Sequence, residues 1–124
     1  LLETEINTRQ IIPSSESSAR AKIKIKNETI ENSAKGSGPV NALDNALREI
    51  LIEKYPHLKD LTLKDYRVRV VSGSKGTESL VRVIIETSDM KDSWSTIGVS
   101  ADIVQASWKA LIDSFEYKLM NQPS

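Results

Sequence analysis

Few residues in this sequence have the chemistry and spacing of a catalytic or metal site. His57 is the only histidine, and it follows Tyr55-Pro56 with no catalytic partner nearby in the sequence. A histidine base needs a hydrogen-bonded nucleophile and an orienting group, and no nucleophile-elbow pattern surrounds His57. Because the chain has no cysteine, Cys-His catalysis and thiolate metal sites are excluded. We therefore expect no catalytic residue and no metal ligand, with His57 a solvated loop residue and the scattered Asp and Glu at the surface.

A glycine-containing turn, Gly36-Ser37-Gly38, precedes Pro39, where a helix is predicted to begin. Backbone N–H groups at a helix start can bind an anion, helped by the positive end of the helix dipole. The turn lacks the lysine of a phosphate-binding P-loop and the third glycine of a dinucleotide fingerprint. Two interpretations remain open: a plain strand-to-helix turn, or a place where a small ligand approaches the backbone.

Basic side chains alternate with apolar ones on two predicted strands. They are Lys22, Lys24 and Lys26 on the first strand and Arg67 and Arg69 on the second. Sheets that bind single-stranded nucleic acid expose aromatic side chains beside such charges, and these strands do not. We interpret the stripes as solvated sheet faces that oppose edge aggregation, with RNA binding as the alternative ranked last. Trp94 and Trp108 are expected to pack in a core or an interface.

Period-two alternation predicts the strands of the first half. A first strand is expected at about 3–12, a polar loop at 13–18, a clear strand at about 21–25, a turn at Asn27-Glu28 and a weaker strand at about 29–34. Apolar residues at three- and four-residue spacing then predict a helix that starts at Pro39 and ends before Pro56. They are Val40, Leu43, Leu47, Ile50 and Leu51.

The second half repeats this plan. Strands are expected at about 66–70, 81–85 and 94–99. Ser100 suits the N-cap of a second helix, and Asp102 suits its positive first turn. The helix is expected over about 103–119, with an apolar stripe at Val104, Trp108, Leu111 and Phe115.

The two halves align with a nearly constant shift: Ile23 corresponds to Val83, and Leu43 to Val104. Each half also has glycine just before its helix. The sequence therefore predicts an α+β fold of two pseudo-repeated βββα units, with antiparallel sheets and helices packed on one face. We expect one domain over 1–124, with unit one at about 1–58 and unit two at about 59–124.

Bulk composition excludes several partners without naming one. The 124 residues carry 17 Lys+Arg and 17 Asp+Glu, so no net field favours nucleic acid or an anionic membrane. The absence of cysteine fits a reducing, cytoplasmic environment, and the start of the chain lacks the pattern of a signal peptide. Because the sequence begins with Leu1, we expect it to be a piece of a longer protein.

Two motifs go beyond composition. The segment Gly36-Ser37-Gly38-Pro39-Val40-Asn41-Ala42-Leu43 resembles the G-x-G-P-V-x-A segment of the regulatory domain in the isopropylmalate and citramalate synthase family. A longer stretch, from Ser93-Trp94-Ser95-Thr96-Ile97-Gly98-Val99-Ser100 through Trp108 to Leu119, is similar to that family's C-terminal signature. With Tyr66-Arg67-Val68-Arg69-Val70 between them, the resemblance covers nearly the whole chain.

This resemblance implies a division of labour. In the family, a separate N-terminal barrel condenses acetyl-CoA with a 2-keto acid and uses a divalent metal, so no cofactor is expected in the present domain. The C-terminal domains pair as homodimers and bind the pathway's end product at their interface, which inhibits the distant catalytic site. The fragment itself is expected to be non-catalytic, and its parent protein an acyltransferase.

The resemblance also implies an effector and a set of binding residues. The segment Ala106-Ser107-Trp108 and the residues 113–119 are more similar to citramalate synthases, which supply isoleucine synthesis, than to most leucine-pathway enzymes. Isoleucine is therefore the expected effector, with a leucine-sensing domain of 2-isopropylmalate synthase and a purely structural dimerisation module as the alternatives. The expected effector-binding residues are Gly36, Gly38, Val40, Asn41, Leu63, Tyr66, Val70 and Thr77.

Overall fold

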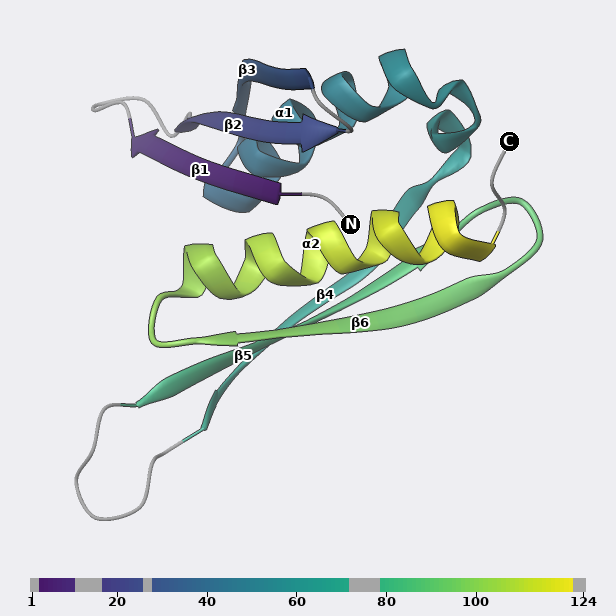
Figure 1. Ribbon diagram of the computed structural model, residues 1–124. Helices are drawn as coiled ribbons and strands as arrows, with labels where there is room; N and C mark the ends of the chain where they lie inside the picture. Colours follow the sequence, from purple (N-terminus) through teal and green to yellow (C-terminus); the bar gives the residue numbers. More distant parts are fainter. Residues whose placement is uncertain (1–2, 11–16, 26–27, 72–78, 122–124) are drawn as a thin grey trace. The chain divides into compact units, whose positions relative to one another are not determined.

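The protein forms two compact units in the computed structural model, which describes residues 3–10, 17–25, 28–71 and 79–121. The units divide between Lys59 and Asp60. Each unit has a three-stranded antiparallel sheet followed by a helix that packs on it (Figure 1). The α+β class and the helix-on-sheet packing predicted from the sequence are confirmed.

Unit 1 contains a sheet in the order β1-β2-β3 and the helix α1. Its elements are β1 (Glu3–Gln10), β2 (Ser17–Ile25), β3 (Glu28–Gly36), α1 (Pro39–Lys54) and a short 3-10 helix, η1 (Pro56–Asp60), at its end. Ile23 of β2 lies opposite Ile30 of β3. Asn32 on β3 donates from Nδ2 to the Ala46 carbonyl of α1 at 3.1 Å, which joins the edge strand to the helix.

The core of unit 1 comes from the predicted alternation and helical stripe. Ala21 and Ile23 on β2 are fully buried, whereas Lys24 on the opposite face is exposed. The helix α1 buries a stripe of leucines, Leu43, Leu47 and Leu51. Burying an aliphatic side chain of this size stabilises the fold by about 1.5–3 kcal/mol, so this row is the main attachment of the unit's helix.

Unit 2 repeats the arrangement with a sheet in the order β4-β5-β6 and the helix α2. Its elements are β4 (Thr62–Val71), β5 (Leu80–Ser88), β6 (Ser93–Ser100) and α2 (Ile103–Asn121). The helix packs on β5 and β6. The β4–β5 register shifts between Leu63 and Asp65, where Lys64 is an extra residue on β4.

The core of unit 2 lies between its sheet and α2. Val83 and Ile85 on the central strand are fully buried, and Trp94 on β6 is almost so. Trp94 donates from Nε1 to the Ser114 carbonyl at 3.1 Å, and its ring stacks on Tyr117 with centroids 4.9 Å apart. Trp108 is also buried. Both tryptophans therefore pack in the core, as predicted.

Two local predictions were wrong. Ser100 is not the N-cap of the second helix, because it belongs to β6, where it pairs with Val81. The cap is Asp102, whose Oδ1 accepts from the Val104 N–H at 2.8 Å. The predicted loop at 13–18 is also too long, because β2 begins at Ser17 and pairs with β3 from that residue. The turn expected at Asn27-Glu28 lies partly outside the described residues, and Glu28 already belongs to β3.

None of the helices in the described part of the chain is both long enough and apolar enough to cross a membrane.

Candidate functional site

The turn between β3 and α1 is built by close backbone packing and side-chain capping. A Cβ placed on Gly36 would lie 2.5 Å from the Ala42 amide nitrogen, so glycine is required where the strand passes the helix. The Asn41 side chain turns back and accepts from the Ser37 N–H through Oδ1 at 3.1 Å. Asn45 then ties α1 to β3 through the Lys35 carbonyl at 2.9 Å. The predicted residues Gly36 and Asn41 thus lie together and define the turn.

Gly38 occupies the N-cap position of α1 and differs from Gly36 in its surroundings. Its backbone is extended, at φ −162° and ψ 176°, and a Cβ added there would meet no atom within 4 Å. Among the described residues no side chain caps α1, and the first turn of the helix has no acidic residue. The positive end of the helix dipole is therefore not neutralised by a carboxylate of that turn. A ligand carboxylate would suit this position both in charge and in space.

The second group of predicted residues lies on β4. Lys64 is an extra residue on β4 and interrupts the alternation of side chains along the strand. Leu63, an odd-numbered residue, therefore lies on the same side of the sheet as the even-numbered Tyr66, Val68 and Val70. We call Leu63, Tyr66, Val68 and Val70 the β4 row. Its cross-strand neighbours include the buried Val83 and Ile85, so the row faces the side of the sheet on which α2 packs.

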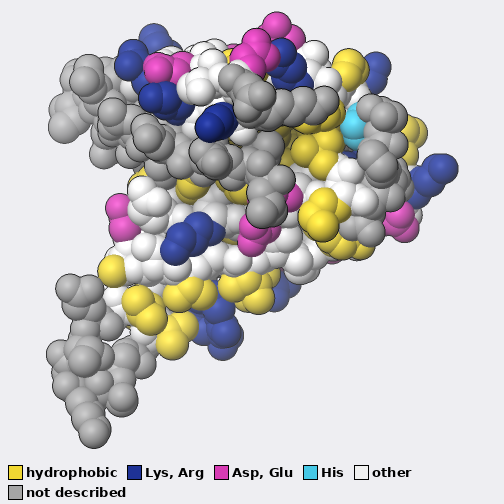
Figure 2. All heavy atoms as spheres, in the orientation of Figure 1, with side chains coloured by type: hydrophobic (Ala, Val, Ile, Leu, Met, Phe, Trp, Pro, Cys, Tyr) yellow, Lys and Arg dark blue, Asp and Glu magenta, His cyan; other side chains and the backbone are white. Residues whose placement is uncertain are grey.

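The β4 row is anchored at Tyr66 and open beyond it. Tyr66 Oη lies 3.1 Å from Ser107 Oγ on α2, and Ser107 in turn donates to the Ile103 carbonyl at 2.7 Å. Val68 and Val70, in contrast, are 41% and 64% exposed. An apolar surface with one hydrogen-bonded hydroxyl can accept a hydrocarbon side chain. In Figure 2, hydrophobic side chains lie along the strands of unit 2 on the face in view.

The structure thus brings the predicted residues together in two groups. Gly36, Gly38, Val40 and Asn41 form the β3–α1 turn of unit 1, and Leu63, Tyr66 and Val70 belong to the β4 row of unit 2. Thr77 lies outside the described residues. Sequence reasoning missed Val68 and Ser107. The alternation of Tyr66, Val68 and Val70 was a signal for the first, whereas nothing in the sequence pointed to a contact with Ser107.

A buried ion pair in unit 2 was also missed. Lys118 on α2 donates to Asp89 Oδ2, and both side chains are almost completely buried. Asp89 also accepts from the Lys91 and Asp92 N–H groups at 2.7 and 2.6 Å, in the turn between β5 and β6. The hydrogen bond from Lys118, followed by those from the backbone, lowers the pKa of Asp89 well below its usual value. The pair fixes this turn to the last part of α2.

His57 is not the solvated residue that the sequence predicted. It lies in η1, and its ring meets the Tyr55 ring edge-on with centroids 6.5 Å apart. Both ring nitrogens are buried, and neither has a hydrogen-bond partner among the described residues. In the part of the chain that the structure describes, neither nitrogen is therefore bonded to a nucleophile or a carboxylate.

Comparison with known proteins assigns the chain to one family. Residues 1–119 match the model of the LeuA allosteric (dimerisation) domain. The chain is 50% identical over 103 residues to an (R)-citramalate synthase of Geobacter sulfurreducens, covering 83% of this chain and 20% of that protein. It is 48% identical over 109 residues to an (R)-citramalate synthase of Aquifex aeolicus, covering 88% and 20% respectively.

A relative with a different name is less similar. The chain is 35% identical over 95 residues to a 2-isopropylmalate synthase of Methanocaldococcus jannaschii, covering 77% of this chain and 17% of that protein. The chain therefore spans about a fifth of the length of the curated relatives it matches.

Proposed function

Because the chain belongs to the LeuA allosteric (dimerisation) domain family, we propose that it is the feedback-regulatory domain of a citramalate synthase and that it binds isoleucine. The observation that carries this choice is the difference in similarity: 47–50% identity to three (R)-citramalate synthases against 35% to a 2-isopropylmalate synthase. Citramalate synthases supply isoleucine synthesis, so isoleucine is the end product that would signal sufficiency.

Each of the two groups of residues suits one part of an amino acid, and each group lies within its own unit. At the start of α1, near Gly38 and the N–H groups of Val40 and Asn41, the turn offers space and a positive helix end that suit a carboxylate. On β4, the side chains of Leu63, Tyr66 and Val70 offer an apolar surface that suits a hydrocarbon side chain. Gly36 maintains the turn, and Thr77 is retained as a contact from the resemblance alone.

We further propose that the domain functions as a homodimer with the effector at the dimer interface. Val68 and Val70 leave apolar surface exposed on the side of the sheet that carries α2, and pairing with a second copy would cover it. A ligand that contributes to such an interface stabilises one arrangement of the dimer. This differential affinity is what an allosteric effector requires.

The rest of the proposed protein lies outside this chain. A catalytic barrel of the same polypeptide would condense acetyl-CoA with pyruvate, with a divalent metal bound there. The present domain would then contribute only inhibition, without a cofactor or catalytic group of its own. We place the whole protein in the cytoplasm, among the acyltransferases of branched-chain amino acid biosynthesis. The alternatives are a leucine-sensing domain and a structural dimerisation module without a ligand.

Calorimetric titration of the chain with isoleucine, leucine and valine tests the proposal. A misplaced methyl group in an apolar site changes binding by about 1–3 kcal/mol, roughly 10- to 200-fold in affinity. We expect isoleucine to bind most tightly, and sedimentation to show a dimer at micromolar concentration. Tightest binding of leucine would instead assign the leucine pathway. If none of the three binds to a dimer, the structural alternative is correct.

Two isosteric substitutions at Gly38 test where the carboxylate binds. Gly38→Asp and Gly38→Asn both fit the open space and the extended backbone, and both residues are preferred N-caps, so α1 should remain folded. Only aspartate adds a negative charge. We expect it to weaken isoleucine binding at least about tenfold more than asparagine does, since two like charges near 4 Å repel by about 1–4 kcal/mol. Equal effects would mean that the carboxylate lies elsewhere.

A second matched pair tests the β4 row. Val70→Ala removes apolar contact area at the proposed side-chain site, whereas Val99→Ala removes the same atoms from the opposite face of the same sheet. We expect the first to weaken isoleucine binding about tenfold and the second to leave it unchanged. Loss of binding in both variants would indicate a general effect on the sheet and not a local contact.

A further inference from the structure

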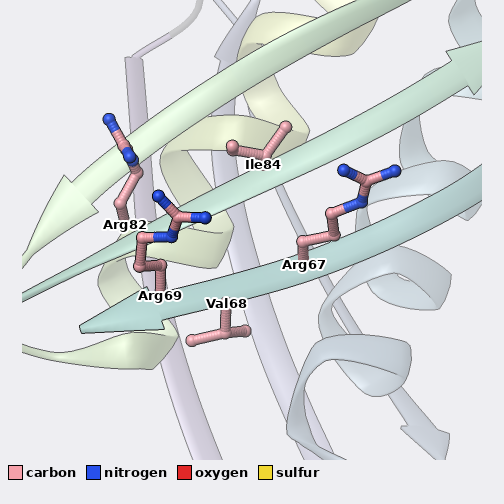
Figure 3. A pocket seen from close by; sticks show the side chains of 5 residues that line it. All are labelled: Arg67, Val68, Arg69, Arg82 and Ile84. Atoms are coloured by element: carbon pink, nitrogen blue, oxygen red, sulfur yellow. The ribbon is translucent and has the colours of Figure 1, made fainter.

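The face of unit 2's sheet that points away from α2 carries a cluster of arginines. The residues Thr96, Gly98 and Ile85 face α2, so the alternate residues of each strand lie on the opposite side. On that side a surface hollow of about 470 Å³ is lined by Arg67, Val68, Arg69, Arg82 and Ile84. Figure 3 shows the three arginines and Ile84 rising from the same side of β4 and β5. Val68 is the one lining residue that also belongs to the β4 row, and its side chain points to the other side of β4 in Figure 3.

The register places like charges directly against each other. Arg69 lies opposite Arg82, and Arg67 lies opposite Ile84 two residues along each strand. Like charges at directly opposed positions destabilise an antiparallel pair unless something between them is negative. Among the described residues, the ion pair in this cluster joins Arg67 to Asp65, with 2.7 Å between Nε and Oδ2. The pair of Arg69 and Arg82 therefore remains uncompensated among the described residues.

Arg82 provides a second, independent observation. Its Nε is buried, and no hydrogen-bond acceptor reaches it within the described part of the chain. A buried donor without an acceptor costs free energy, and this N–H belongs to the same guanidinium that faces Arg69. Both the repulsion and the unsatisfied donor would be relieved by an acceptor that carries negative charge.

We propose that this hollow binds a diphosphate group, either free or as part of a larger ester. A guanidinium donates two parallel hydrogen bonds to phosphate oxygens, so three of them match an anion with several oxygens and more than one charge. A single carboxylate has only two oxygens and one charge. Positions two apart on a strand are separated by about 6.6 Å, and opposed positions by about 5 Å. Two linked phosphates can meet arginines spread over this area, with Ile84 as an apolar floor.

Titration calorimetry with inorganic pyrophosphate and with ADP, at constant ionic strength, tests the proposal on the chain. We expect saturable binding by the wild-type chain and a loss of at least tenfold in affinity for Arg69→Gln. Lys64→Gln is the matched control, because it removes the same charge from an exposed position of the same strand. Its affinity should stay within about twofold of the wild type, since a general loss of positive charge acts weakly at this distance.

The stability of the variants without ligand gives a separate measurement. Arg69→Gln removes the repulsion from Arg82, so the chain should unfold at the same or a higher urea concentration than the wild type, which excludes misfolding as the cause of lost binding. Tighter binding of ADP than of pyrophosphate would support an ester whose organic part contacts Ile84, and the reverse order a free anion. Absence of binding by both at millimolar concentration, or equal binding by wild type and Arg69→Gln, would overturn the proposal.

Discussion

Replacing Gly98 by alanine should be the most destabilising small change in unit 2. A Cβ built on Gly98 would lie 1.9 Å from the Ala106 carbonyl oxygen and 2.9 Å from the Ala110 amide nitrogen. Both are backbone atoms of α2, so no side chain can rotate away to make room. Because carbon and oxygen normally approach to about 3.3–3.6 Å, the helix would have to retreat from β6 by about 1.5 Å.

The cost of that retreat follows from what joins α2 to the sheet. Thr96 Oγ1 donates to the Ala110 carbonyl at 2.8 Å, and a shift of this size breaks the bond, with a net loss of about 1 kcal/mol. Overpacking and the loosened contacts of the core add about 1–3 kcal/mol. The lower entropy of an unfolded chain with alanine restores about 0.4–1 kcal/mol. We expect Gly98→Ala to lower the free energy of unfolding by about 2–3 kcal/mol.

Urea denaturation followed by circular dichroism measures this change, and Gly38→Ala is its matched control. The Gly38 backbone is extended, and its added Cβ would meet no atom within 4 Å. Alanine is a poorer N-cap than glycine, which offsets the entropic gain of about 0.4–1 kcal/mol, so this variant should stay within about 1 kcal/mol of the wild type. If Gly98→Ala and Gly38→Ala unfold at the same urea concentration, the close approach of β6 and α2 does not limit the packing of this unit.

Two further predictions concern the N-cap of α2 and the ion pair between Lys118 and Asp89. Asp102→Ala removes the N-cap and should lower the free energy of unfolding by about 1 kcal/mol in urea titrations, whereas Ser100→Ala should cost less, because Ser100 is not the cap. The folded-state pKa of Asp89 is lowered by Lys118, so its contribution to stability is complete above the unfolded pKa of about 3.9 and is lost as the pH falls below that value. Below pH 4, the free energy of unfolding should therefore fall less steeply with decreasing pH for Asp89→Asn than for the wild type. Equal slopes for the two proteins would contradict this assignment.

The elements of the fold were predictable because their signals are local. Alternation of Ala21 and Ile23 with lysines identifies a strand with one buried face, and the structure buries both residues completely. The leucine stripe of α1 follows the helical period in the same way. Because the same order of three strands and a helix recurs in both halves, the sequence also predicted that each sheet packs with its own helix. Each of these inferences needs only residues within a few positions of one another.

The errors and omissions came from interactions between distant residues. Ser100 and Asp102 are both good caps, and only the pairing of Ser100 with Val81 decides that the strand continues and the helix starts later. The extra residue at Lys64, which brings Leu63 to the face of Tyr66, depends on the partner strand β5. The ion pair of Asp89 and Lys118 likewise joins positions 29 residues apart.

The candidate site shows the same division between local and distant information. The glycine turn was visible in the sequence, but composition and spacing left its role open, and the expected effector contacts came from the family resemblance. What the structure adds is a difference between the two glycines. A Cβ on Gly36 would lie 2.5 Å from the backbone of α1, so this position requires glycine, and Gly98 is required in the same way by the backbone of α2. A Cβ on Gly38 would instead face open space.

Gly36 and Gly38 therefore differ in whether the packing of a helix requires a glycine at that position. Gly36 and Gly98 lie at the corresponding strand-to-helix approach of the two units, so a glycine there follows from packing a helix closely on its own sheet. No such requirement exists at Gly38, whose extended backbone is accessible to any residue. Aspartate or asparagine there would even cap α1 better than glycine does. Helix packing therefore does not explain the glycine at Gly38, whereas the proposed binding of an effector carboxylate at this helix start would account for the open space.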